Sequence, residues 1–141
     1  MSFKKKNIII TGSTKGLGKE LAIEFDKQGA NIILIGRSKD LLNQLKKKLN
    51  NSKNHLFLNG DMLYKNILNR NFKKINKKFN KIDIIIHCIG GSFGINNPLS
   101  SWKNFEMSLR GNLGLAIEIN NFFIPKMIKK KNGNIIHVGS V

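Results

Sequence analysis

A glycine-rich turn near the N-terminus constrains the fold of this chain more than any other feature. The run Asn7–Thr11 is rich in β-branched residues, and the letters G-S-T-K-G-L-G follow it, directly before a helical pattern. Strand, glycine loop and helix in this order form the arrangement that holds a dinucleotide pyrophosphate. The first N–H groups of a helix have no partner inside the helix, and the helix dipole adds partial positive charge there. A phosphate group supplies the missing acceptors and the opposite charge.

Three glycines in this turn each have a predicted task. Gly12 lets the chain leave the strand in a tight turn, Gly16 removes a Cβ atom where a phosphate would approach, and Gly18 lets the helix pack close to the strand. With Thr11 in front, the G-x-x-x-G-x-G spacing resembles the glycine motif of the short-chain dehydrogenase/reductase family. The resemblance implies that these loop residues bind a nicotinamide dinucleotide: Thr11, Gly12, Ser13, Lys15, Gly16, Leu17 and Gly18. An ordinary βα turn is the alternative for the glycine cluster taken alone.

Length and composition indicate one globular domain. The chain has 141 residues, of which 40% are hydrophobic, and this is enough for a sizeable core and too apolar for a disordered chain. No apolar run approaches the roughly 20 residues of a membrane span. The single cysteine, Cys88, excludes an internal disulfide and has no partner pattern for a metal site. We therefore predict a cytoplasmic protein without a bound metal.

The net charge of +17 raises nucleic acid as a partner. The positive residues are almost all lysines, and the chain is also crowded with Asn and Ile. All three residue types have A/T-rich codons, so the base composition of a genome is a sufficient explanation. Lysine runs such as 46–48 and 129–131 fall on the polar sides or ends of helical patterns. We expect no membrane partner, and nucleic-acid binding is the least favoured alternative.

Strand-like and helix-like segments alternate along the chain, which predicts βαβ units around a parallel sheet. Five apolar runs are the expected strands: Asn7–Thr11, Asn31–Gly36, His55–Asn59, Ile82–Ile89 and Asn134–Val138. Helical spacing predicts a helix after each of the first three strands, then a short helix over Ser101–Leu109 and a longer one from Asn112 to Lys131. The expected fold class is α/β, a Rossmann-like three-layer sandwich in a single dinucleotide-binding domain over residues 1–141. The family resemblance implies the strand order 3-2-1-4-5.

The end of the second strand predicts which dinucleotide binds. Folds specific for NAD usually place an acidic residue there to hold the ribose hydroxyls. This chain has Gly36 and then Arg37 at that place. A guanidinium binds a 2′-phosphate through paired hydrogen bonds, and Lys15 adds a second cation nearby. We therefore predict NADP(H) in preference to NAD(H); the alternative is that Arg37 is a solvated loop residue.

The ends of the third and fourth strands carry further candidate residues. The resemblance implies that Asp61, with Met62 beside it, binds the adenine; Asp61 could equally cap a helix that begins near Tyr64. The fourth strand ends H-C-I-G-G, where the family usually shows Asn-Asn-Ala-Gly, so only Gly90 of that motif is retained, beside the cofactor ribose. His87 is predicted to be a packed or hydrogen-bonded strand residue and not a catalyst.

Two catalytic residues are implied by the resemblance. Asn112, in R-G-N-L-G, is similar to the family's active-site asparagine, which holds a water in a proton relay by locally disturbing a helix. Ser140, after the fifth strand, is similar to the catalytic serine that hydrogen-bonds the substrate oxygen. The alternatives are a helix N-cap for Asn112 and a plain turn residue for Ser140.

One part of the family's active site has no counterpart in these 141 residues. The general acid/base of the family is the tyrosine of Tyr-x-x-x-Lys, downstream of the serine. The only tyrosine here is Tyr64, and Leu68 stands four positions later. We expect either a truncated product of a longer gene or a natural short form, with negligible turnover for this chain alone.

These observations lead to one favoured function. It is an NADP(H)-dependent oxidoreductase of the short-chain type, acting on a carbonyl or alcohol and catalytically incomplete as given. A non-enzymatic dinucleotide-binding or regulatory protein is the main alternative. The fifth strand would be a sheet edge, and an apolar face of the last helix (Leu115, Ile119, Phe122 and Phe123) would lack cover, so we expect a homo-oligomer.

Overall fold

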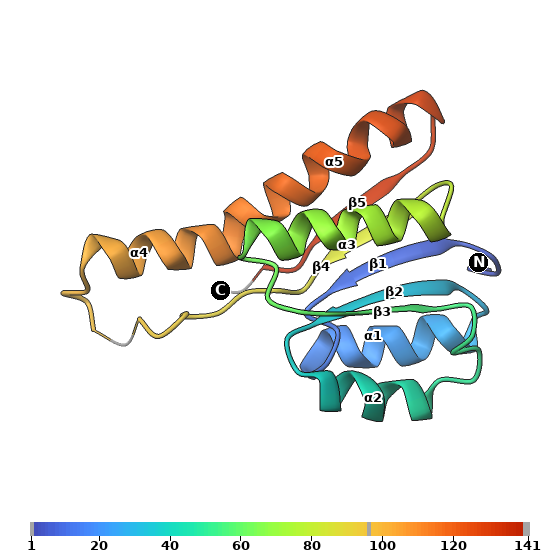
Figure 1. The fold of residues 1–141 in the computed structure, drawn as a ribbon, viewed down its shortest axis with the longest axis horizontal. Coiled ribbons are helices and arrows are strands. Elements are labelled where there is room, and N and C mark those ends of the chain that lie inside the picture. The colour runs from blue at the N-terminus through green and yellow to red at the C-terminus, as the bar shows by residue number, and fades with distance from the viewer. Residues whose placement is uncertain (1, 96, 140–141) are drawn as a thin grey trace.

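The computed structural model describes residues 2–95 and 97–139 and shows an α/β sandwich in three layers (Figure 1). Five strands form one parallel sheet: β1 (Asn7–Thr11), β2 (Asn31–Gly36), β3 (Leu56–Asn59), β4 (Ile84–His87) and β5 (Asn134–His137). Their order across the sheet is β3-β2-β1-β4-β5. The fold class and the strand order predicted from the sequence are both confirmed.

Helices cover both faces of the sheet. α1 (Gly16–Lys27) and α2 (Lys39–Lys48) lie on one face, and α3 (Lys65–Lys78) and α5 (Leu115–Lys129) lie on the other (Figure 1). Along β1, Ile8 and Ile10 pack in the cluster with α1 and α2, while Ile9 packs in the cluster with α3 and α5. All three are fully buried, as expected for a parallel strand that is covered on both sides.

The strand β4 is shorter than the apolar run that predicted it. Ile82 lies before the strand and is nevertheless 7% exposed, because it packs in the core without pairing in the sheet. After His87 the pairing ends, since the Cys88 N–H donates to the Thr11 hydroxyl (3.1 Å) and not to a strand carbonyl. Packing against the core, and not strand pairing, therefore accounts for the buried Ile82 at one end of this run and the half-buried Cys88 and Ile89 at the other.

Residues 102–129 form one uninterrupted helix with a π-helical turn inside it. α4 (Trp102–Leu109) runs into the π-helix η1 (Arg110–Gly114) and continues as α5. A helix start at Asn112 was expected from the sequence, and that start is wrong, because the backbone is already helical at Arg110 and stays so at Gly114. Asn112 is therefore not an N-cap. Single π turns inside α-helices occur frequently at functional sites.

The inner face of α5 is covered within the chain itself, which corrects the expectation from the sequence. Leu115, Ile119 and Phe123 are at most 5% exposed. Phe122 stacks on Phe72 of α3 with 4.2 Å between the ring centroids, and Phe123 meets the same ring edge-on at 5.5 Å. α3 thus provides the cover that the sequence pattern could not assign.

A different apolar stripe is exposed along the same long helix. Leu113, Ile117 and Ile128 are 56%, 47% and 70% exposed. Within the described residues β5 is an edge strand that pairs with β4 alone, as expected, and its Ile136 is 47% exposed. No helix in the described part of the chain is long and apolar enough to cross a bilayer.

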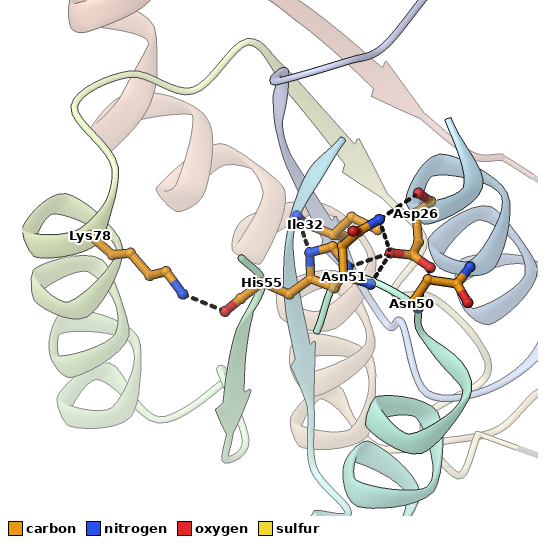
Figure 2. Close-up of polar contacts among 6 residues, drawn as sticks. All are labelled: Asp26, Ile32, Asn50, Asn51, His55 and Lys78. Atoms are coloured by element: carbon orange, nitrogen blue, oxygen red, sulfur yellow. Dashed lines mark hydrogen bonds and ion pairs between the residues drawn. The ribbon is translucent and has the colours of Figure 1, made fainter. Parts of the chain in front are cut away.

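A buried polar cluster joins α1, β2, the residue before β3 and the segment after α2 (Figure 2). The Asp26 carboxylate accepts hydrogen bonds from the N–H groups of Asn50 (2.7 Å) and Asn51 (3.0 Å) and lies 2.9 Å from Nε2 of His55. Nδ1 of His55 accepts a hydrogen bond from the Ile32 N–H (3.2 Å). His55 therefore carries its proton on Nε2 and donates it to Asp26 as a neutral imidazole.

The pKa values of this pair move in the direction that keeps His55 neutral and Asp26 ionised. Burial lowers the pKa of His55, and the hydrogen bond to Asp26 opposes the shift only in part. Burial alone would raise the pKa of Asp26, but the hydrogen bonds from Asn50, Asn51 and His55 outweigh it, so this pKa lies below its ordinary value.

We expect acid to destabilise the protein in two steps. His55 binds a proton more readily in the unfolded chain, so the free energy of unfolding falls below about pH 6.5, by about 1.4 kcal/mol per pH unit until the lowered folded pKa is reached. Asp26 contributes stability above about pH 4, and this contribution is lost as the pH falls through its lowered folded pKa.

Urea titrations between pH 4 and pH 8 measure the first of these steps, and titrations continued below pH 4 measure the second. The variant His55→Gln should lose part of the slope below about pH 6.5. A part remains, because burial also lowers the pKa of His87. Equal slopes in the variant and the wild-type protein would contradict the assignment of this step to His55.

Candidate active site

A cleft of about 820 Å³ opens where the strands end and the following loops begin. Crevices at the carboxyl ends of parallel strands are the usual ligand sites of such sheets. The lining comes from the loops after β1 to β4, from the end of β2, from α1, α2, α4 and α5, and from the residue after β5. Its residues are Gly12, Thr14, Lys15, Gly16, Leu17, Gly18, Ile35, Gly36, Arg37, Ser38, Leu41, Gly60, Asp61, Met62, Leu63, Cys88, Ile89, Gly90, Phe93, Gly94, Met107, Leu115 and Val138.

The glycine loop brings the start of α1 to this cleft. A Cβ atom on Gly12 would lie 2.9 Å from the Cys88 carbonyl oxygen, and one on Gly18 would lie 2.6 Å from the carbonyl oxygen of Gly12. Gly12 also has a φ of +65°, in the region that favours glycine. The N-cap residue Lys15 makes no side-chain capping bond to the described residues, and apart from Gly16's own chain neighbours and helix backbone no described atom lies within 4 Å of the place of a Cβ on Gly16. The start of α1 thus has room for a phosphate group.

Two predicted binding residues in this loop use their hydroxyls for internal hydrogen bonds. The Ser13 hydroxyl donates to the Ile35 carbonyl (3.2 Å) and accepts from the Ile35 N–H (3.0 Å), which ties the loop to β2. The Thr11 hydroxyl accepts the Cys88 N–H and ties the end of β1 to the chain after β4. Both residues are buried and neither lines the cleft. Their side chains therefore position the loop and do not face a ligand.

Two cations line the cleft near the end of β2. Lys15 comes from the glycine loop and Arg37 follows β2, and both are exposed. A side chain on Gly36 would collide with the methyl group of Thr14, so this place has no room for an acidic residue while Thr14 keeps its position. The Asn59 amide donates to the Arg37 carbonyl (2.8 Å) and fixes the turn.

Asp61 is the single carboxylate in the described lining. Its Oδ1 accepts a hydrogen bond from the Leu63 N–H (3.0 Å), which forms a turn before α3. The N-cap of α3 is Tyr64, so the proposed helix-capping role of Asp61 is wrong. Met62 also lines the cleft, and it is 3% exposed.

Asn112 is joined to the loop after β4 by two hydrogen bonds. Its Oδ1 accepts from the Gly91 N–H (2.9 Å), and its Nδ2 donates to the Gly91 carbonyl (3.0 Å). Nδ2 also donates to the Ser108 carbonyl one helical turn earlier (3.0 Å). A Cβ atom on Gly90 would lie 3.1 Å from Oδ1 of Asn112, so the loop approaches this side chain closely. The structure thus brings two predicted site residues, Gly90 and Asn112, together: Gly90 lines the cleft, and Asn112 holds the loop that contains it without being part of the lining.

His87 and Cys88, which replace the family's two asparagines, are held by packing and hydrogen bonding. His87 is 5% exposed, stacks on His137 and lies 2.9 Å through Nε2 from the Asn120 amide oxygen. It is therefore the packed, hydrogen-bonded strand residue that was predicted, and burial lowers its pKa. Burial raises the pKa of the Cys88 thiol, which disfavours the reactive thiolate. In residues 2–95 and 97–139 no three His, Cys, Asp or Glu side chains gather as a metal site would require.

Several lining residues were missed by the sequence analysis. Thr14 lies inside the glycine motif, and its place in the loop could have indicated it. Phe93, Met107 and Val138 carry no motif or period that points to a site. Ser140 lies outside the described residues.

Comparison with known proteins agrees with this geometry. A family profile described as short chain dehydrogenase matches residues 6–141. The chain is 31% identical, over 96% of its length, to an NADPH-dependent pterin aldehyde reductase of Arabidopsis thaliana, and 30% identical, over 100%, to the 3-oxoacyl-[acyl-carrier-protein] reductase FabG of Buchnera aphidicola. It spans 56% and 57% of those two proteins.

A solved structure gives the same fold. L-sorbose reductase from Gluconobacter frateurii, complexed with NADPH and L-sorbose, superposes with a TM-score of 0.89 at 23% identity, covering 100% of this chain and 54% of that one. The family match covers nearly the whole chain, and the glycine loop follows β1, the middle strand of the β3-β2-β1-β4-β5 sheet. The chain therefore belongs to the short-chain dehydrogenase family.

Proposed function

We propose that the chain is the cofactor-binding part of an NADP(H)-dependent oxidoreductase that acts on a carbonyl or alcohol substrate. The observation that carries this proposal is the cleft in which the uncapped start of α1 lies together with Lys15 and Arg37. A bound nicotinamide dinucleotide would supply or accept the hydride. The loop Gly12–Gly18 would hold its pyrophosphate, and Asp61, Met62 and Gly90 would line the rest of its site.

The preference for NADP(H) rests on charge and space at the end of β2. A carboxylate there would repel a 2′-phosphate, whereas the planar guanidinium of Arg37 can bind it through two parallel hydrogen bonds. Lys15 stands in the same cleft as a second cation. Gly36 has no room for an acidic side chain beside Thr14. The NADPH dependence of the Arabidopsis relative supports the same preference.

Asn112 and Ser140 are the proposed catalytic residues of this chain. Asn112 sits in a π-helical turn, and such a turn is the local disturbance of a helix that the relay role requires. Ser140 would hydrogen-bond the substrate oxygen. The tyrosine of Tyr-x-x-x-Lys is not among the 141 residues, and Tyr64 stands at the start of α3, 63% exposed. We infer that the chain alone binds cofactor without turnover, a property that a non-enzymatic dinucleotide-binding protein would share.

Isothermal titration calorimetry tests the cofactor proposal. We expect the wild-type chain to bind NADPH more tightly than NADH. Lys15→Gln and Arg37→Gln should each weaken NADPH binding by about 10- to 100-fold, since a hydrogen bond to a charged group contributes about 1.5–3 kcal/mol. NADH binding should change little, because NADH lacks the 2′-phosphate. Lys74→Gln, on the exposed side of α3, is the matched control for loss of one positive charge. No binding of either dinucleotide would refute the proposal.

Incubation with NADPH and a panel of ketones and aldehydes tests the inference on turnover. We expect no decrease of absorbance at the reduced-cofactor band beyond the rate without protein. The physical reason is that positioned acid–base catalysis contributes about 10²–10⁴-fold, and the tyrosine that performs it in the family is not in this chain. Clear turnover would mean that another group of this chain transfers the proton.

Size-exclusion chromatography with light scattering tests the proposed homo-oligomer. The exposed stripe of Leu113, Ile117 and Ile128 and the open edge of β5 should lead to self-association, because both features favour contact with a second surface. Ile117→Lys should shift the distribution toward the monomer. A monodisperse wild-type monomer at all concentrations would contradict the prediction.

A further inference from the structure

We propose that Phe93 is a positioning residue: its ring, seated on the bare α-carbon of Gly111, holds the loop Gly90–Gly94 against the π-helical turn and so sets the shape of the cleft beside Asn112. Phe93 lies in the loop after β4, and Gly111 lies in η1 next to Asn112. The two residues are far apart in sequence, and neither belongs to the glycine motif.

The first observation is the fit of the ring over Gly111. A Cβ atom on Gly111 would collide with the tip of the Phe93 ring, since Cζ is the nearest atom and Cε1 and Cε2 lie only 2.5 Å away. Gly111 is buried, whereas its neighbour Asn112 is exposed. Glycine weakens a helix relative to alanine, so a glycine at this place needs another reason. Contact with the aromatic ring supplies that reason, because no larger residue leaves space for it.

The second observation is the backbone of the loop. Phe93 has a φ of +48°, a conformation that a bulky residue adopts only at a cost in free energy. Gly91 and Gly94 on either side have φ values of +139° and +85°. A loop with two glycines and a strained aromatic residue does not hold this conformation by itself. The contact between the ring and Gly111 stabilises it from outside.

The third observation links the ring to the site. Asn112, the residue after Gly111, hydrogen-bonds the N–H and the carbonyl of Gly91 at 2.9 and 3.0 Å. Gly91 lies two residues before Phe93 in the loop. The ring and the amide therefore fasten the same stretch of loop to the same turn of helix. Hydrogen bonds between exposed groups contribute little by themselves, because water competes for both partners. The apolar contact of the Phe93 ring with Gly111 is what keeps the hydrogen bonds between Asn112 and Gly91 formed.

Displacement of the ring would also change the cleft directly. Phe93 lines the cleft together with Gly90, Gly94 and Met107. If the ring leaves Gly111, the wall formed by these residues moves, and Asn112 is free to turn away from Gly91. Phe93 thus acts on the site through Asn112 and through the wall, without a proposed contact to any reacting atom.

Amide hydrogen exchange measured by NMR, without cofactor, tests the contact itself. Phe93→Ala should raise the exchange rate of the Gly91 N–H at least tenfold while the amide of Ile9 in β1 keeps its wild-type rate. Trp102→Ala removes an exposed aromatic ring from α4 and is the matched control, with no expected change at Gly91. An unchanged Gly91 rate in Phe93→Ala would overturn the proposal.

A double-mutant cycle tests whether Phe93 and Gly111 hold the loop through their mutual contact. Gly111→Ala places a methyl group where the ring lies, so it should raise Gly91 exchange as much as Phe93→Ala does. In the Phe93→Ala background the same methyl meets no ring, and Gly111→Ala should cause no further increase. Additive effects would overturn the proposal, because they would show that the two residues act independently.

The consequence for binding rests on the proposed function and is measured separately. Phe93→Ala should weaken NADPH and NADH by the same factor, whereas the variants of Lys15 and Arg37 affect NADPH alone. Unchanged affinities for both dinucleotides would overturn the claim that Phe93 sets the shape of the cleft. If the wild-type chain binds neither dinucleotide, the proposed function fails, while the exchange data still decide whether Phe93 holds the loop.

Discussion

Close contact of backbone with backbone at the end of β1 is the constraint on which the rest of the site depends. The α-carbon of Gly12 lies against the carbonyl of Cys88, and that of Gly18 lies against the carbonyl of Gly12. Any side chain at either glycine would push α1 away from the sheet, and its first N–H groups would no longer open onto the cleft. The hydroxyls of Thr11 and Ser13 then tie this loop to the chain after β4 and to β2. The open space at the start of α1 therefore depends on this packing.

The apolar pattern was sufficient for the parallel strands, but not for contacts between distant segments. Apolar runs separated by helical spacing identify the strands, and their order, which the family resemblance implied, is the order in the sheet. The stacking of Phe122 on Phe72 could not be predicted, because it joins α5 to a helix about 50 residues earlier. The continuity of the helix through Asn112 was missed for another reason: apolar spacing does not distinguish a helix that restarts from one that continues with an extra residue in a turn.

For the site, the sequence motifs predicted which segments line the cleft better than they predicted where each side chain points. Lys15, Arg37 and Asp61 line the cleft as a position at the end of a strand or inside the glycine loop predicts. Ser13 belongs to the same loop, yet its hydroxyl points to β2, because Ile35 offers it both a donor and an acceptor. Phe93 lies in a loop without period or motif, where only the folded structure reveals a partner.

The two walls of the cleft are held by interactions of different strength. At the β1–β2 side the fastening groups are buried: Ser13 is fully buried and its bonds to Ile35 are sheltered from water. Between the loop after β4 and η1 the bonds of Asn112 to Gly91 are exposed, and the loop contains a strained Phe93. Local stability follows burial of contacts, so opening of the second wall costs less free energy than opening of the first. A ligand would thus meet a preformed surface at the glycine loop and, on the other side, an adjustable wall formed by the loop after β4. The position of that wall depends on the ring of Phe93.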